Sequence, residues 1–284
     1  MQHQRKEFNV KGFLGKLLTY GFLIAWMTFA FYAIGWIVAS SFSTTREIFK
    51  NNLLQSGIHL ENYAKAFRTH KMALYFGNST MYVLGALFFI ILIAAPASYV
   101  LSRAEFRGRR VAQSLFVAGM GVPRTMMMIP LFMVFVRLRL VNTLPGLIIV
   151  YVCMSIPFTV YLLTGFFGSL PRELEEAATI DGCTDIQAFW KIMLPLAQPG
   201  IITVTIFNFI GLWNDYFWAL IFVNTPERRT LALGLQSLVQ SMRYTGDWAG
   251  LFASVVIVFL PTFVLYIFLS EKIIAGITAG AVKS

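Results

Sequence analysis

The chain alternates between long apolar runs and short polar breaks. Six runs are long enough to cross a bilayer as helices, because about 20 apolar residues at 1.5 Å per residue span roughly 30 Å of hydrocarbon. The pattern predicts an all-α membrane protein with six transmembrane helices, and an even number of spans puts both termini on one side. The runs cover approximately residues 17–39, 79–101, 113–136, 144–168, 199–223 and 250–270.

The composition agrees with this pattern. Hydrophobic residues make up 57% of the 284 positions and charged residues only 13%, so most of the chain is solvated by lipid. The net charge of +10 comes from basic residues scattered over the polar breaks, where cations meet membrane headgroups, and it does not indicate nucleic-acid binding. Four basic residues precede the first run and two closely follow it, which favours a cytoplasmic N-terminus.

The polar break over residues 171–195 differs from the others because it is acidic. Five of the thirteen carboxylates lie between residues 173 and 185. Pro171 suits a first helical turn, and Gly182 suits a left-handed helix end. Thr184 and Gln187 form a capping-box pattern that opens a second helix, which runs to Pro195. The sequence predicts a helix-turn-helix outside the bilayer, either a docking surface for a soluble protein or an ordinary amphipathic connector.

The spacing in this break is also a motif. Glu176-Ala177-Ala178 is followed at fixed intervals by Gly182 and by Ile192-x-Leu194-Pro195. This spacing resembles the cytoplasmic loop of the membrane subunits of bacterial ABC importers. Residues 58–284 resemble the carbohydrate-uptake branch of that family, and the second permease of maltose-type systems in particular. The segments that carry this wider resemblance are HLENYAKAF, FRGRR, NTLPGLI, WNDYFWAL and GITAGAVKS.

The resemblance implies a domain organisation and a set of partners. Residues 1–16 and 275–284 would be cytoplasmic, and residues 17–274 would form a six-span permease domain with a coupling loop (171–195) and an external loop (224–249). The partners would be a homologous second permease, two copies of an ABC ATPase and an external solute-binding protein, in a prokaryotic cell membrane (the inner membrane of a Gram-negative cell). The chain has no Gly-x4-Gly-Lys-Ser/Thr loop, so ATP and Mg would be bound by the ATPase and this chain would not be an enzyme.

The same resemblance assigns roles to residues in the two loops. In the external loop, polar and aromatic side chains would face the binding protein, although a solvated linker is the alternative; these are Arg243, Tyr244, Asp247 and Trp248. In the coupling loop, acidic and small residues would contact the ATPase; these are Glu175, Glu176, Ala177, Ala178, Asp181 and Gly182.

Two ionisable residues fall within the apolar runs, where a charge is costly and therefore a functional candidate. Arg124 is expected near the middle of the third run, where it would line the pathway, pair with a carboxylate of the second permease, or reach the membrane surface. Asp215 is expected in the outer half of the fifth run. With nearby polar and aromatic residues it would form a sugar-binding stripe, or the group would be an aromatic belt at the headgroups; its members are Asn208, Trp213, Asn214, Asp215 and Tyr216.

The resemblance implies a permease for a disaccharide or oligosaccharide, and Arg124 extends this expectation to an acidic one; which sugar it is and whether the two permeases are identical stay open. The alternative is a self-sufficient six-span secondary carrier, which predicts midplane carboxylates and inverted repeats. A membrane-embedded hydrolase would need a nucleophile beside a base, and no histidine lies within a run. The three histidines also show no metal-ligand spacing, so no metal site is expected.

Overall fold

The structure is a computed structural model that describes the backbone of residues 10–281 and the side chains of residues 15–242 and 244–270. Over those residues the chain forms helices and no strand. Four helices are long and apolar enough to cross a membrane, and two bent helix pairs raise the number to six if each pair is one span. The four are α1 (Val10–Ser41), α4 (Met72–Arg103), α7 (Leu144–Ser169) and α14 (Trp248–Ala281).

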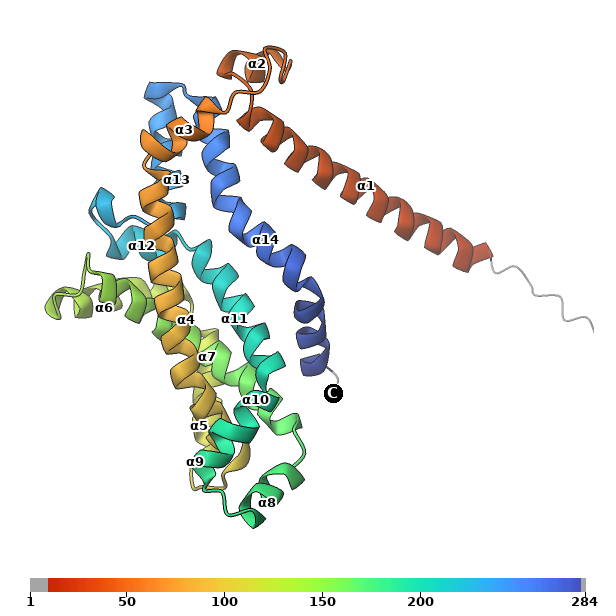
Figure 1. Ribbon diagram of the computed structural model, residues 1–284, viewed down its shortest axis with the longest axis vertical. Coiled ribbons are helices and arrows are strands. Elements are labelled where there is room, and N and C mark those ends of the chain that lie inside the picture. The colour runs from red at the N-terminus through yellow and green to blue at the C-terminus, as the bar shows by residue number, and fades with distance from the viewer. Residues whose placement is uncertain (1–9, 282–284) are drawn as a thin grey trace, which may run out of the picture.

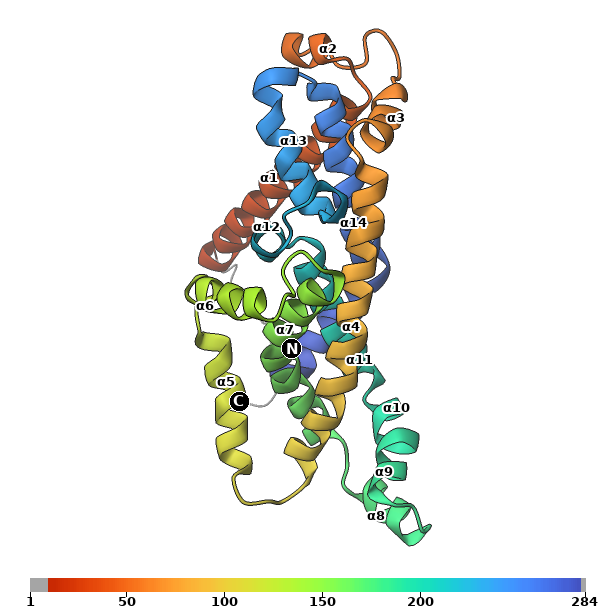
Figure 2. The same cartoon turned by 90° about the vertical axis from the view of Figure 1, so that its left-hand side faces the viewer.

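The run predicted over 113–136 is not one straight helix. It is divided into α5 (Arg109–Gly121) and α6 (Arg124–Arg137), which meet at 101°, and Figure 2 shows α6 crossing the direction of α5. Pro123 accounts for the break, because proline has no N–H to donate and pushes the residue before it out of the helical region. Val122 is accordingly extended, at φ −74° and ψ 120°.

The run predicted over 199–223 is also interrupted. The helix α11 (Gln198–Trp213) ends at Asn214, and a short α12 (Phe217–Phe222) begins three residues later. The Asp215 carboxylate accepts the backbone N–H groups of Trp218 and Ala219, at 3.2 and 3.3 Å from one oxygen. A side chain that binds the free N–H groups of a new helix favours starting it at that point. The break is therefore fixed by local chemistry.

The centre of the molecule is a pair of packed helices, α4 and α7, which make the most extensive contact in the described chain. Tyr151 of α7 and Tyr82 of α4 are buried in the main hydrophobic core. A second hydrophobic core surrounds Phe167, near the C-terminal end of α7, and Phe189. The long axis of the molecule follows α4 (Figure 1). These two helices form the frame to which both ends of the molecule are attached.

One end of the molecule is a cap made of α2 (Thr45–Lys50), α3 (Glu61–Arg68) and α13 (Leu231–Thr245) (Figures 1 and 2). The loop predicted over 224–249 is thus mostly helix. Leu231 is fully buried, and its N–H donates to Ser79 Oγ at 2.7 Å. Asn78 of α4 donates to two carbonyl oxygens of the turn before α13.

The opposite end carries α8 (Glu173–Ile180), α9 (Asp185–Ala188) and α10 (Leu194–Leu196), with a π-helical turn (Phe189–Met193) between the last two. Figure 1 shows these elements at the far end of α4 from the cap. The helices α1 and α14 both run away from the cap, toward that end. This arrangement agrees with a chain that crosses the membrane repeatedly between two polar ends.

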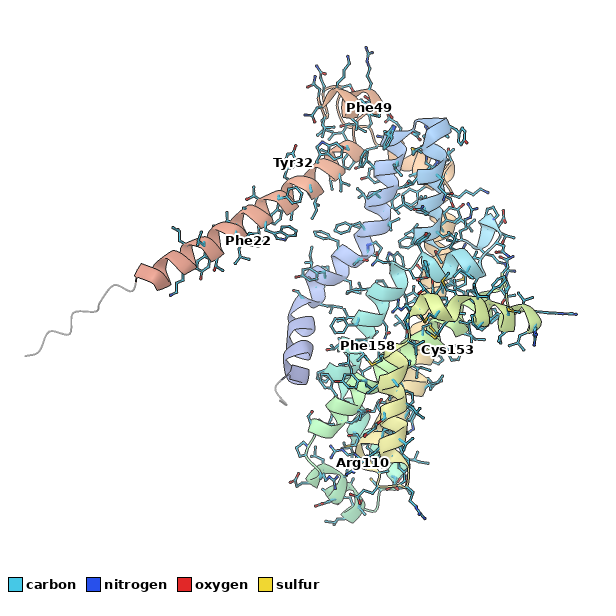
Figure 3. The ribbon with its side chains drawn as sticks, turned by 180° about the vertical axis from the view of Figure 1, so that it is seen from behind. Phe22, Tyr32, Phe49, Arg110, Cys153 and Phe158 are labelled. Atoms are coloured by element: carbon cyan, nitrogen blue, oxygen red, sulfur yellow. The ribbon has the colours of Figure 1, made fainter. Side chains whose placement is uncertain are left out.

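The first helix stands away from the rest of the described chain. It meets α14 near the cap, and the two diverge from there (Figure 1). Its aromatic side chains project outward, and Phe22 and Tyr32 are 70% and 68% exposed (Figure 3). An apolar helix with this much free surface is stable only in lipid or against another subunit.

The predicted terminal segments fall partly outside the described residues. Residues 1–9 of the segment predicted over 1–16 and residues 282–284 of the tail predicted over 275–284 lie outside them. The helix α1 already begins at Val10, and α14 continues to Ala281. Neither predicted segment boundary coincides with the end of a helix.

The start of α7 gives a test of the packing. A Cβ atom added to Gly146 would lie 1.9 Å from the carbonyl oxygen of Leu140, a backbone atom. We expect Gly146→Ala to lower the free energy of unfolding by about 1–3 kcal/mol, the usual cost of overpacking. Thermal unfolding of the purified protein in lipid measures this. Gly211→Ala is the control because nothing lies within 4 Å of its added Cβ, and equal unfolding midpoints for both variants would contradict the packing described.

Candidate functional site

The coupling loop has the local structure that its sequence predicts. Gly182 adopts φ 80°, the left-handed region in which a residue with a side chain is strained, and it ends α8 with a tight turn. Thr184 and Gln187 form the predicted capping box: the Thr184 N–H donates to Gln187 at 3.0 Å, and the Gln187 N–H donates to the Thr184 hydroxyl at 3.3 Å. The second helical segment ends at Leu196, one residue beyond the prediction. Pro171 does not lie in the first helical turn as predicted, because it precedes both α8 and the N-cap residue of that helix.

This loop is attached to the spans by a buried charge. Arg103, at the end of α4, is 8% exposed, and its Nε lies 3.5 Å from the Glu175 carboxylate of α8. The Arg103 guanidinium also donates to the carbonyl oxygen of Leu170, just after α7. Tyr99 of α4 interacts with the same carboxylate and packs its ring 5.1 Å from that of Phe189. Three elements, α4, α7 and α8, thus meet at one ion pair.

The outer face of α8 is free. Apart from Thr179, its exposed residues are spaced three or four positions apart, which places them on one side of the helix. They are Glu173, Glu176, Ala177 and Ile180. Ile180 is 86% exposed, and Ile186 of α9 is 71% exposed. The sequence analysis missed these two isoleucines, although an apolar side chain within a polar, acidic loop was a signal that could have found them.

The six predicted coupling residues do not lie on one surface. Glu176, Ala177, Asp181 and Gly182 are exposed, whereas Glu175 is held in the ion pair with Arg103. Ala178 is only 2% exposed, and it lies on the inner side of α8, where that helix meets α9 and the π-helical turn. A direct contact between Ala178 and another protein is therefore excluded in this conformation. Its small size serves the packing of the loop itself.

The predicted stripe in the fifth run is likewise divided. Asn208 is buried and donates to the Thr159 hydroxyl of α7 at 2.9 Å. Trp213 is 2% exposed and donates to the carbonyl oxygen of Val258 in α14. Only Asn214 and Tyr216 are exposed. The structure does not bring these side chains together on one polar surface.

Asp215 lies between α11 and α12, and Arg124 lies at the bend between α5 and α6. The Asp215 carboxylate accepts a hydrogen bond of 3.1 Å from the Tyr151 hydroxyl, in addition to those from the start of α12. Arg124 is the first residue of α6, at the 101° bend and not in the middle of a straight span, and it is exposed. It is close enough to Asp215 for their charges to interact. The two ionisable residues of the spans therefore share one region, where their role in transport stays a prediction.

The predicted external residues have different surroundings in the cap. Asp247 accepts a hydrogen bond of 2.8 Å from Lys65 Nζ and lies 2.9 Å from His70 Nε2. Trp248 packs edge-on against Phe49, with ring centroids 5.7 Å apart. Tyr244 is 91% exposed and is free to meet another molecule. The Arg243 side chain lies outside the described residues. Within the described part of the chain, no group of three histidine, cysteine or acidic residues is arranged to hold a metal ion.

Comparison with known proteins agrees with this geometry. The family model for the inner membrane component of binding-protein-dependent transport systems matches residues 87–273, which include the coupling loop. The chain belongs to this family. It is a multi-pass membrane permease of an ABC importer and not an enzyme, because a separate ATPase hydrolyses ATP in these systems.

Named relatives of this permease match most of its length. The diacetylchitobiose uptake permease NgcG of Streptomyces coelicolor is 36% identical over 94% of this chain and 88% of its own length. The trehalose transport permease SugB of Mycobacterium tuberculosis is 31% identical over 90% of this chain and 93% of its own. A solved chain of a bacterial ABC transporter that imports the acidic polysaccharide alginate has a TM-score of 0.79, at 24% identity over 95% of this permease and 99% of that chain. The likeness to this solved chain shows that the two proteins share a fold.

The burial of Ala178 gives a prediction for the coupling loop of this permease. We expect Ala178→Leu to disturb the loop at a cost of about 1–3 kcal/mol, because the added atoms have no room. Ala177→Leu is the matched control, since that side chain is exposed on the same helix. Hydrogen exchange of residues 173–188 should be faster in Ala178→Leu and unchanged in Ala177→Leu. Equal protection in the two variants would show that Ala178 is not packed as described.

The Asp247 cluster gives a prediction about how the stability of the folded protein depends on pH. Burial alone would raise the pKa of Asp247, but the hydrogen bonds from Lys65 and His70 outweigh it, and the pKa lies below its ordinary value of 3.8. The stabilisation is therefore complete above about pH 4 and is lost as the pH falls through the lowered pKa. We expect Asp247→Asn to reduce stability at pH 7 by about 1 kcal/mol, a modest value because Lys65 is half exposed.

Unfolding midpoints at pH 7 and pH 3 measure this difference. The difference between the variant and the unmodified permease should be smaller at pH 3 than at pH 7, because part of the protein then carries a proton on Asp247. A constant difference at both pH values would mean that the charge of Asp247 contributes nothing.

Proposed function

We propose that this permease forms, with a homologous second permease, the pathway for a disaccharide or oligosaccharide delivered by an external binding protein. The relatives support a carbohydrate, since four of them are permeases for diacetylchitobiose, trehalose, arabinooligosaccharides and sulfoquinovosyl glycerol. The last of these carries a sulfonate, and the exposed guanidinium of Arg124 could meet an acidic sugar of that kind. An acidic sugar is therefore included in the proposal.

The observation that carries this proposal is the free face of α8 on a firmly attached loop. Glu173, Glu176, Ala177 and Ile180 form an exposed surface of two carboxylates and two apolar side chains, which is suited to a groove on a soluble partner. In the proposal this partner is the ATPase, present in two copies, which binds ATP and Mg. The loop side of the membrane is then the cytoplasm, and both termini lie there.

The free surface of α1 supports a second permease. A helix that leaves the body and exposes its apolar side chains on all sides provides a large area for an apolar neighbour. In the proposal the neighbour is the homologous permease, together with lipid. The cap faces outward and meets the binding protein, with Tyr244 as its free aromatic side chain.

Energy transfer follows from the attachment of α8. If the closed and open ATPase pairs bind different permease conformations, ATP binding and hydrolysis shift the permease between them. A docking helix can transmit this difference only if it moves together with the spans. The Arg103–Glu175 ion pair and the buried Ala178 give α8 that attachment.

The test is the ATPase activity of the assembled transporter in lipid vesicles, with its binding protein and a panel of neutral disaccharides, oligosaccharides, uronates and phosphorylated sugars. We expect one sugar class to stimulate hydrolysis. Ala177→Trp, which places a bulky ring on the docking face, should reduce that stimulation tenfold or more, since a loss of about 1.4 kcal/mol in the contact is a factor of ten.

Thr179→Trp is the matched control, because Thr179 is exposed on the same helix but lies outside the docking face. It should leave stimulation unchanged. Sugar flux through vesicles that contain this chain alone, without any ATPase, would instead establish a self-sufficient carrier and overturn the proposal.

A further inference from the structure

Two adjoining hollows lie at the coupling-loop end of α5, and neither has a part in the proposed transport mechanism. The larger is a groove of about 570 Å³ between α4, α5 and α7. The smaller, of about 430 Å³, surrounds the turn that leads into α5. Arg109 lines both. The two hollows therefore adjoin at Arg109 and differ in their chemistry.

The groove is suited to a hydrocarbon chain. Much of its wall is apolar and includes Phe116, Val117, Leu162 and Phe166. Its strongest polar groups are already engaged: Arg109 donates to the carbonyl oxygens of Leu101 and Ser102 at 2.8 and 2.7 Å, and Gln113 donates to that of Leu101 at 2.9 Å. These bonds satisfy carbonyl groups at the end of α4. A sugar would find few free partners there, whereas an acyl chain needs none.

The smaller hollow is suited to an anion. Arg110 lines it and Arg107 stands in the same turn; both are exposed, and neither makes an ion pair within the described part of the chain. Glu105 is the one acid in its lining. Arg110 lies at the end of the molecule that also carries α8, where the spans finish (Figure 3). Basic side chains at such a boundary attract anionic headgroups.

We propose that the two hollows together bind one anionic phospholipid, with its phosphate against Arg107 and Arg110 and an acyl chain in the groove. Charge complementarity selects the headgroup, and the apolar walls select the tail. The site is built by three helices, so a bound lipid holds α5 against α4 and α7. This site does not depend on which sugar is transported.

The test uses native mass spectrometry of the transporter as it assembles in its own membrane, with added phosphatidylglycerol or phosphatidylcholine. We expect selective binding of phosphatidylglycerol. The double variant R107Q/R110Q should weaken it by about fivefold for each arginine, the effect of one basic residue at an anionic surface. Arg109 is left intact because it closes the end of α4. Glu105→Gln should strengthen binding, since it removes the opposing charge.

A second variant tests the groove. Gly165 lines it, and a Cβ added there meets nothing within 4 Å, so Gly165→Leu fills the groove without a clash and should reduce lipid binding. The controls are Gly211→Leu, whose added Cβ also lies in open space, and R46Q/K50Q, which removes two exposed cations from the cap. Equal binding of the two lipids, or equal binding in Gly165→Leu and Gly211→Leu, would overturn the proposal.

Discussion

The coupling end of the permease depends on one buried cation. The Arg103 guanidinium touches three elements: it belongs to α4, donates to the carbonyl oxygen that follows α7, and pairs with Glu175 of α8. A guanidinium removed from water without a partner costs several kcal/mol. Separating α8 from the spans would leave this charge buried and unpaired. The ion pair therefore opposes the separation of α8 from the spans.

The breaks within the spans follow from a second constraint. In hydrocarbon, each free backbone N–H or carbonyl group costs several kcal/mol, so a broken helix must satisfy these groups with protein atoms. Asp215 does so for the start of α12, and the Asn142 side chain accepts the N–H groups of Asn224 and Thr225. The carboxylate of Asp215 thus has a structural reason to be in the membrane, whatever its part in transport.

The sequence was sufficient where structure is decided by neighbouring residues. The Gly182 turn and the Thr184 capping box were predicted because their chemistry is local. The burial of Ala178 and the separation of Trp213 from Asn214 depend on helices distant in sequence, and no local pattern shows them. For α13 the signals were present but unused: Thr230 caps its start, and Gly246 ends it at φ 60°. This helix was not predicted because apolar and polar residues are mixed along its sequence.

The ion pair in the cap also bears on the order of synthesis. Lys65 and His70 leave the ribosome early, whereas Asp247 follows 177 residues after His70. Asp247 immediately precedes α14, so it is synthesised only after all the earlier helices. Until then two basic side chains lack the carboxylate that joins them. The ion pair of the cap therefore cannot form in a chain that stops before residue 247.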